Sequence, residues 1–196
     1  MNETESLKRL DEIERLDPDP TLDVRASQIM EIVGETPQGL RILVERYSGS
    51  LSVNIANSLA FTLNLKSSQS TSETAPLVFE FAFGVKRHYN HGVLMNTLNA
   101  MKNQISFGPG WGNTPQPPRP IFPFLEHSLN FIGKHNTLVH FAAVELVTLI
   151  CERELVTAVF KHNEWKWIEK RTHELSDTDD ALLLDALSEF RDCNEN

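Results

Sequence analysis

An apolar, helix-like stretch recurs five times along this chain, at intervals of about forty residues. The stretches lie at 26–32, 55–62, 97–104, 142–149 and 183–190. Repeats of this period are typical of helical hairpins that stack on one another, because a lone hairpin cannot bury its own apolar face. The sequence therefore predicts an all-α chain in which about five helical hairpins form one continuous α-solenoid.

Apolar periodicity predicts ten helices in a single domain that covers residues 1–196. They are expected at 3–16, 22–33, 36–49, 51–65, 76–85, around 94–101, 122–132, 137–152, 156–173 and 177–190. Thr36 is expected to cap the third helix, with Pro37 in its first turn, and Gly34 to end the second helix in a left-handed conformation. The start of 51–65 alternates like a strand, but the length of this run favours a helix.

The second helix of each expected hairpin carries a similar order of residues. In Ala142–Leu149 two small residues precede apolar ones, and this order resembles the armadillo-repeat pattern. Ala100–Asn103 matches part of that pattern, while Arg25–Ile32, Ile55–Thr62 and Ala186–Phe190 match it more loosely. The resemblance to armadillo and HEAT repeats implies a right-handed α-α superhelix whose second helices line a concave groove.

In armadillo proteins the Asn of the pattern hydrogen-bonds the backbone of an extended peptide, and Asn103 is the residue that matches it here. A full amide ladder is absent, since the equivalent positions in the other repeats hold Glu31, Phe61, Thr148 and Glu189. Asn96, Asn99 and Asn103 nevertheless share one helix face, which predicts either an amide stripe for a partner or a merely solvated face. The predicted groove comprises Glu31, Phe61, Asn96, Asn99, Asn103, Glu145, Thr148, Glu152 and Glu189.

The charge balance indicates the kind of partner. Eighteen Lys and Arg against 27 Asp and Glu give a formal net charge of −9. This excess works against nucleic-acid binding and favours a basic protein or peptide, although acidic surface residues also serve solubility. His162, Lys166, Lys170 and His173 form a basic stripe on one expected helix, and it is too small to favour nucleic acid against the overall charge.

A Gly- and Pro-rich loop is expected at 105–121, because its composition is incompatible with a helix. The segment 115–120 favours an extended polyproline conformation. Phe107 and Trp111 are candidates either to anchor the loop on the helices or to contact a partner, and Arg119 is a further candidate contact.

Catalytic and metal-binding patterns are not found. His88 and His91 flank an expected turn without further ligands, which favours a surface pair over a metal site. An enzyme would need residues that meet only in the fold, such as His127, His140 and Glu145. We therefore expect a protein that is not an enzyme and that needs neither cofactor nor metal.

Cys151 and Cys193 are more typical of reduced thiols than of a disulfide framework, which favours a cytoplasmic protein. The charged first twenty residues do not resemble a signal peptide, and no apolar run is long enough for a membrane span.

Taken together, these features favour a protein-binding scaffold with an acidic and polar groove. The alternative is an acidic bacterial immunity protein that neutralises a basic toxin by charge complementarity. The sequence leaves the identity of the partner and the oligomeric state open.

Overall fold

The computed structural model describes residues 22–49, 52–67, 75–84, 90–107 and 121–195, together with Thr4, Lys8 and Asp11. Every secondary-structure element within these residues is an α-helix, which confirms the all-α prediction. Most of the helix expected at 3–16 and most of the loop expected at 105–121 lie outside the described residues.

The described helices follow the predicted order closely. They are α2 (Leu22–Val33), α3 (Pro37–Tyr47), α4 (Val53–Ser67), α5 (Ala75–Gly84), α6 (His91–Phe107), α7 (Phe122–Leu129), α8 (Asn136–Glu152), α9 (Val156–Val159), α10 (His162–Glu174) and α11 (Ala181–Glu195). The ambiguous segment at 51–65 is helical, because α4 covers nearly all of it.

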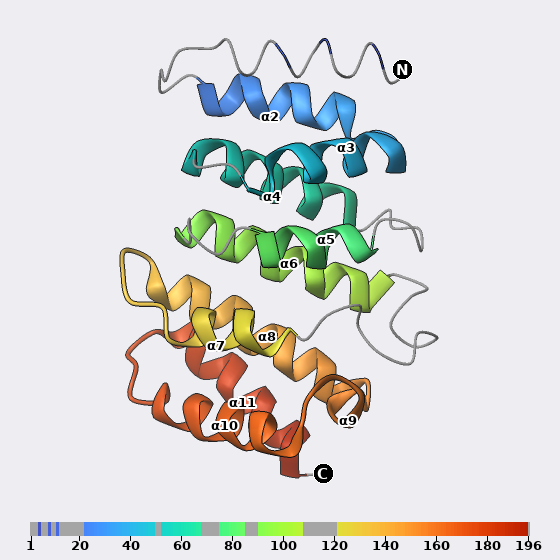
Figure 1. Cartoon of the computed structure of the whole chain (residues 1–196). Coiled ribbons are helices and arrows are strands. Elements are labelled where there is room, and N and C mark those ends of the chain that lie inside the picture. The colour runs from blue at the N-terminus through green and yellow to red at the C-terminus, as the bar shows by residue number, and fades with distance from the viewer. Residues whose placement is uncertain are drawn as a thin grey trace.

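The helices pack in two layers that run from the N-terminal to the C-terminal end of the molecule (Figure 1). In the first layer α2, α4, α6, α8 and α11 each contact the next helix in that order. In the second layer α3, α5 and α7 pack on α4, α6 and α8, and α10 continues the layer by packing on α7. The helices α4, α6 and α8 therefore each have first-layer neighbours on two sides and the second layer on a third side.

The start of α3 follows from local capping. The Thr36 side chain accepts a hydrogen bond of 3.1 Å from the Gly39 N–H, and Pro37 occupies the first turn, so the predicted cap is confirmed. The predicted left-handed cap at Gly34 is wrong, because no glycine among the described residues has a positive φ. Gly34 instead allows close packing, since an added Cβ would lie 3.0 Å from Leu40 Cδ2 and 3.1 Å from Thr62 Cγ2.

The helix expected at 156–173 is interrupted, and the structure divides it into α9 and α10. Phe160 adopts an extended conformation, with φ −121° and ψ 146°, and its buried ring stacks on Trp165 at 5.7 Å between centroids. The last helix starts later than the expected residue 177, because the Asp180 carboxylate accepts a hydrogen bond from the Leu183 N–H.

One apolar core lies between the two layers and runs the length of the described stack. α5 contributes Phe79 and Phe81, which are almost fully buried, and α6 contributes Leu94, Leu98 and Met101. This continuous core leaves one side of the first layer uncovered by the second layer, and that side is where a binding surface is sought.

Candidate functional site

The uncovered side of the first layer is identified from the contacts that its helices make with each other. On α4, Ser58 receives a hydrogen bond of 3.1 Å from Ser27 of α2, and Asn64 lies against α6. Around the axis of α4, Phe61 lies between the side that contacts α2 and the side that contacts α6, and opposite the core residues. Phe61 is 38% exposed. α4 therefore presents Phe61 to solvent between its two neighbours.

The same reasoning applied to α6 and α8 gives one continuous surface, which we call the α4–α6–α8 face. It comprises Phe61, Leu65, Met95, Asn99, Lys102, Leu138, Phe141, Glu145, Leu149 and Glu152. On α8, Leu138 is exposed, Phe141, Glu145 and Leu149 are half-buried, and Glu152 is exposed, in a stripe with helical spacing. The face is thus a mixture of apolar and charged side chains.

Three polar contacts set the register between the helices of this face. Asn64 of α4 pairs with both Asn96 and Asn103 of α6, which places Phe61 level with the turn that contains Met95 and Asn99. Lys102 Nζ of α6 donates to Glu145 Oε2 of α8 at 2.7 Å. This contact places each residue of α6 level with the residue 43 positions later on α8. Met95 is therefore level with Leu138.

A row of apolar side chains therefore crosses three parallel helices at one level. Phe61 and Leu138 are each 38% exposed. Met95 and Phe141 are half-buried and pack against the core. No side chain of α6 from His91 to Ser106 is exposed, whereas α4 and α8 on either side have exposed side chains, so the middle of the face is the least accessible part.

The predicted amide stripe is divided between two roles. Asn103 Nδ2 donates to Asn64 Oδ1 and to Ser67 Oγ, each at 3.1 Å, and Asn96 Oδ1 accepts from Asn64 Nδ2 at 3.3 Å. Asn103 and Asn96 therefore join α6 to α4. Asn99 is half-buried and makes no hydrogen bond with the described residues, so it does not take part in joining the two helices.

The acidic residues of the predicted groove also differ from one another. Glu145 is in the ion pair with Lys102, and the two side chains are 30% and 28% exposed. Glu31 is half-buried on α2, and Glu152 and Glu189 are exposed on α8 and α11. Of these acidic residues, Glu152 and Glu189 are therefore the most accessible, while the charge of Glu145 is balanced by Lys102.

Thr148 is not at the surface, although the sequence pattern assigned it to the groove. Its side chain is 5% exposed, and its hydroxyl donates to the Val144 carbonyl at 2.9 Å. The exposed stripe of α8 passes through Leu149 instead. Phe107 ends α6, but its side chain, Trp111 and Arg119 lie outside the described residues.

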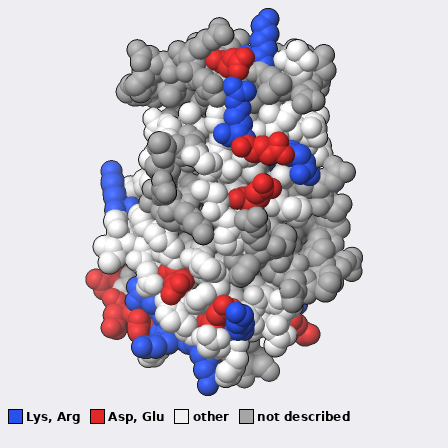
Figure 2. Space-filling view, viewed as in Figure 1, with Lys and Arg blue, Asp and Glu red and all other residues white. Residues whose placement is uncertain are grey.

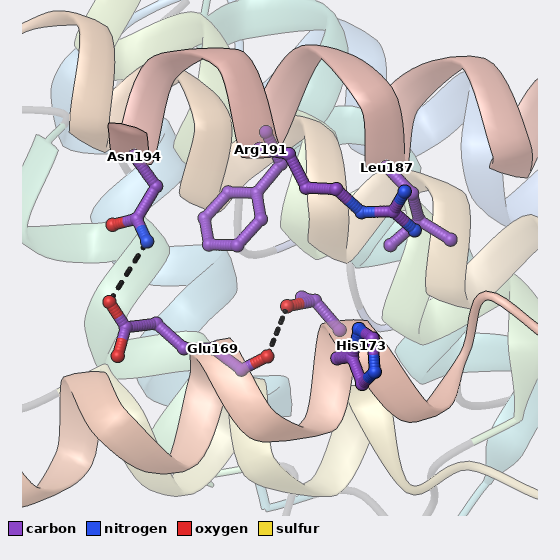
Figure 3. Close-up of a pocket in the computed structure, with 7 residues that line it drawn as sticks. Glu169, His173, Leu187, Arg191 and Asn194 are labelled. Atoms are coloured by element: carbon purple, nitrogen blue, oxygen red, sulfur yellow. Dashed lines mark hydrogen bonds between the residues drawn. The ribbon is translucent and has the colours of Figure 1, made fainter. Parts of the chain in front are cut away.

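A separate pocket of about 200 Å³ lies between α10 and α11 and was not predicted from the sequence. Figure 3 shows Glu169 and His173 on one helix facing Leu187, Arg191 and Asn194 on the other. Asn194 Nδ2 donates to Glu169 Oε1 at 2.9 Å. Asn194 Oδ1 also accepts from Trp165 Nε1 at 3.2 Å, so both polar atoms of this amide have partners within the fold.

Two of the residues that an enzyme would have to bring together have separate partners, since Glu145 pairs with Lys102 and His140 contacts Phe131. His140 is 5% exposed, and its Nε2 lies 3.0 Å from the Phe131 carbonyl oxygen. Burial lowers the pKa of His140, the hydrogen bond to Phe131 opposes this shift, and the charge of Arg171 adds to it. Within the described part of the chain no three His, Cys, Asp or Glu side chains are placed to hold a metal ion.

The basic stripe on α10 is interleaved with carboxylates. Glu174 lies 3.0 Å from Arg171 and 3.7 Å from Lys170. Figure 2 shows Lys and Arg beside Asp and Glu at the lower end of the molecule, with no large patch of one sign on the described surface in that view. An extended basic surface for phosphates is therefore not formed on this side by the described residues.

Among the helices that the structure describes, none has both the length and the apolar character that crossing a membrane requires. No family model, curated protein or solved structure matches this chain.

Proposed function

We propose that this chain is a non-enzymatic binding module, a right-handed α-α superhelix of the armadillo/HEAT type, and that it holds a protein or peptide on the α4–α6–α8 face. The observation that carries the proposal is the level row formed by Phe61, Met95 and Leu138 with Phe141. Large apolar side chains at one level on three adjacent helices form a surface that a partner can bury. Such a row suits anchor residues of a partner.

The charges around this row indicate the chemistry of the partner. Asn99 offers an amide next to the apolar row, and Glu31, Glu152 and Glu189 supply acidic groups towards its margins. The net charge of −9 adds a long-range attraction for basic molecules. A partner that fits therefore presents apolar side chains to the row and basic side chains around them, in a cytoplasmic setting.

The test replaces apolar residues of the row by charged ones and leaves the rest of the chain unchanged. Phe61→Glu and Leu138→Glu introduce a carboxylate where the partner would bury an apolar side chain, and neither residue lies in the fully buried core. Ile132→Glu is the matched control, since Ile132 is 91% exposed in the segment between α7 and α8 and lies outside the face. Circular dichroism and thermal unfolding identify variants that remain folded.

Wild type and variants are used as baits in lysate of the source organism, and each captured protein is then purified and its affinity measured by calorimetry. We expect both face variants to weaken the interaction by roughly 30-fold or more, as for the loss of a central apolar anchor, and Ile132→Glu to leave it unchanged. Equal affinity of all baits would reject the α4–α6–α8 face as the binding site. A single basic partner whose affinity depends on salt but not on Phe61 or Leu138 would favour the immunity-protein alternative.

A further inference from the structure

The C-terminal helix and α8 bring two cysteines together that are far apart in the sequence. Cys151 is in the last turn of α8 and Cys193 is in the last turn of α11. The two helices pack against each other, and both cysteines are half-buried free thiols. Their Sγ atoms are 2.7 Å apart. The sequence predicted two reduced thiols, but it contained no indication that they are adjacent.

The separation is shorter than an ordinary contact between two sulfur atoms. A disulfide has an S–S bond of about 2.05 Å, so a closure of about 0.7 Å from the 2.7 Å between Cys151 and Cys193 would form one. A movement of this size is within the reach of side-chain torsions on two helix ends. The fold therefore already holds the two thiols at a distance from which they can bond.

We propose that Cys151 and Cys193 are a redox modification site, at which a low-molecular-weight disulfide such as oxidised glutathione converts the two thiols into a reversible intramolecular disulfide. In the first step the thiolate of Cys193 attacks one sulfur of the oxidant, and one reduced glutathione leaves. In the second step Cys151 loses its proton to solvent and attacks the sulfur of Cys193, which releases the second glutathione. Two protein thiols and one small disulfide thus give one protein disulfide and two small thiols.

The order of the two steps follows from the surroundings of the thiols. Burial raises the pKa of Cys151 to about 12, and its contact with the Cys193 thiol and the nearby Glu152 carboxylate act in the same direction. Cys151 is therefore protonated at neutral pH and is a poor first nucleophile. Once Cys193 carries glutathione, Cys151 lies within reach of the mixed disulfide and resolves it.

Oxidation would join α8 covalently to α11, the last helix of the first layer. The disulfide would close a loop over residues 151–193, which contains α9 and α10, and would hold α11 on α8. Loop closure of this length lowers the entropy of the unfolded chain, so the oxidised protein should melt higher than the reduced protein. Reversible disulfides of this kind are compatible with a reducing compartment when they respond to a change in redox potential.

The experiment equilibrates the purified full chain in buffers of defined ratios of reduced to oxidised glutathione, and then blocks free thiols with a maleimide. Intact mass, peptide mapping and thermal melting are measured on each sample. We expect a monomer that loses two hydrogens, a cross-linked peptide pair containing Cys151 and Cys193, and a melting temperature raised by roughly 5–15 °C. Reduction with a phosphine should reverse all three changes.

Single serine variants give the matched controls. Cys151→Ser should stop at a glutathione adduct on Cys193. Cys193→Ser should react much more slowly, because burial and the Glu152 carboxylate still raise the pKa of the remaining Cys151 thiol. Neither variant should show the rise in melting temperature. Free thiols under oxidising ratios, glutathione adducts that persist in the wild type, disulfide-linked dimers, or a disulfide that leaves the melting temperature unchanged would each overturn the proposal.

Discussion

Replacing Asn103 by alanine tests whether this amide joins two helices or waits for a partner. Asn103 Nδ2 makes two well-formed hydrogen bonds of 3.1 Å across the α4–α6 contact, and each contributes about 0.5–1.5 kcal/mol net. Asn99→Ala is the matched control, since Asn99 is on the same helix, is also half-buried and makes no hydrogen bond with the described residues. Both changes gain the same helix propensity, which cancels in the comparison.

The difference between the two variants should therefore be about 1–3 kcal/mol, with Asn103→Ala the less stable. An unfolding entropy of about 2.1 cal/mol/K for each of the 196 residues gives about 0.4 kcal/mol/K, so the midpoint difference is about 2–7 °C. Differential scanning calorimetry measures the midpoints, and urea titration checks that the slope m is unchanged. Equal midpoints would refute the structural role of Asn103 and return its amide to the set of candidate partner contacts.

Three other predictions concern stability. The pKa of His140 is lowered below 6.5 in the folded state, so the unfolded chain binds a proton there first as pH falls, and stability is lost below about pH 6.5. Between about pH 7.5 and 5 the melting temperature of wild type should therefore fall more than that of His140→Gln. Parallel curves for the two proteins would contradict this. Leu98 is fully buried, so Leu98→Ala should cost about 2–5 kcal/mol in urea unfolding, and a cost under about 1 kcal/mol would contradict its place in the core. A Cβ at Gly39 would lie 1.8 Å from the Val33 carbonyl oxygen, whereas one at Gly49 meets nothing within 4 Å; Gly39→Ala should therefore lower the melting temperature strongly and Gly49→Ala little.

The sequence predicted the helices best where local chemistry and periodicity agree. Thr36 and Pro37 define the start of α3 without any information from the rest of the fold. The length of the run at 51–65 correctly outweighed its short alternating start, because a run of this length is typical of a helix and exceeds that of most strands. The solenoid itself and its resemblance to armadillo repeats stay predictions.

Long-range packing explains the boundaries that the sequence did not predict. The interruption at Phe160 follows from aromatic contacts that reach beyond the local chain, since Trp165 stacks on Phe160 and also lies 5.6 Å from the Phe190 ring on α11. Apolar periodicity through 156–173 contains no signal for this break. The pairing of Cys151 with Cys193 depends in the same way on how α11 packs on α8.

The register between helices explains why the predicted groove and the α4–α6–α8 face differ. Superposition of the repeats aligned Asn103 with Phe61, but in the structure Asn103 pairs with Asn64 and Ser67, further along α4. A polar residue on a helix surface has the same periodicity whether it faces solvent or a neighbouring helix, so spacing alone cannot separate the two. The conspicuous amides thus serve largely to join helices, while the proposed contact row is carried by apolar residues. One of them, Phe61, was in the predicted groove, whereas Leu138 was not.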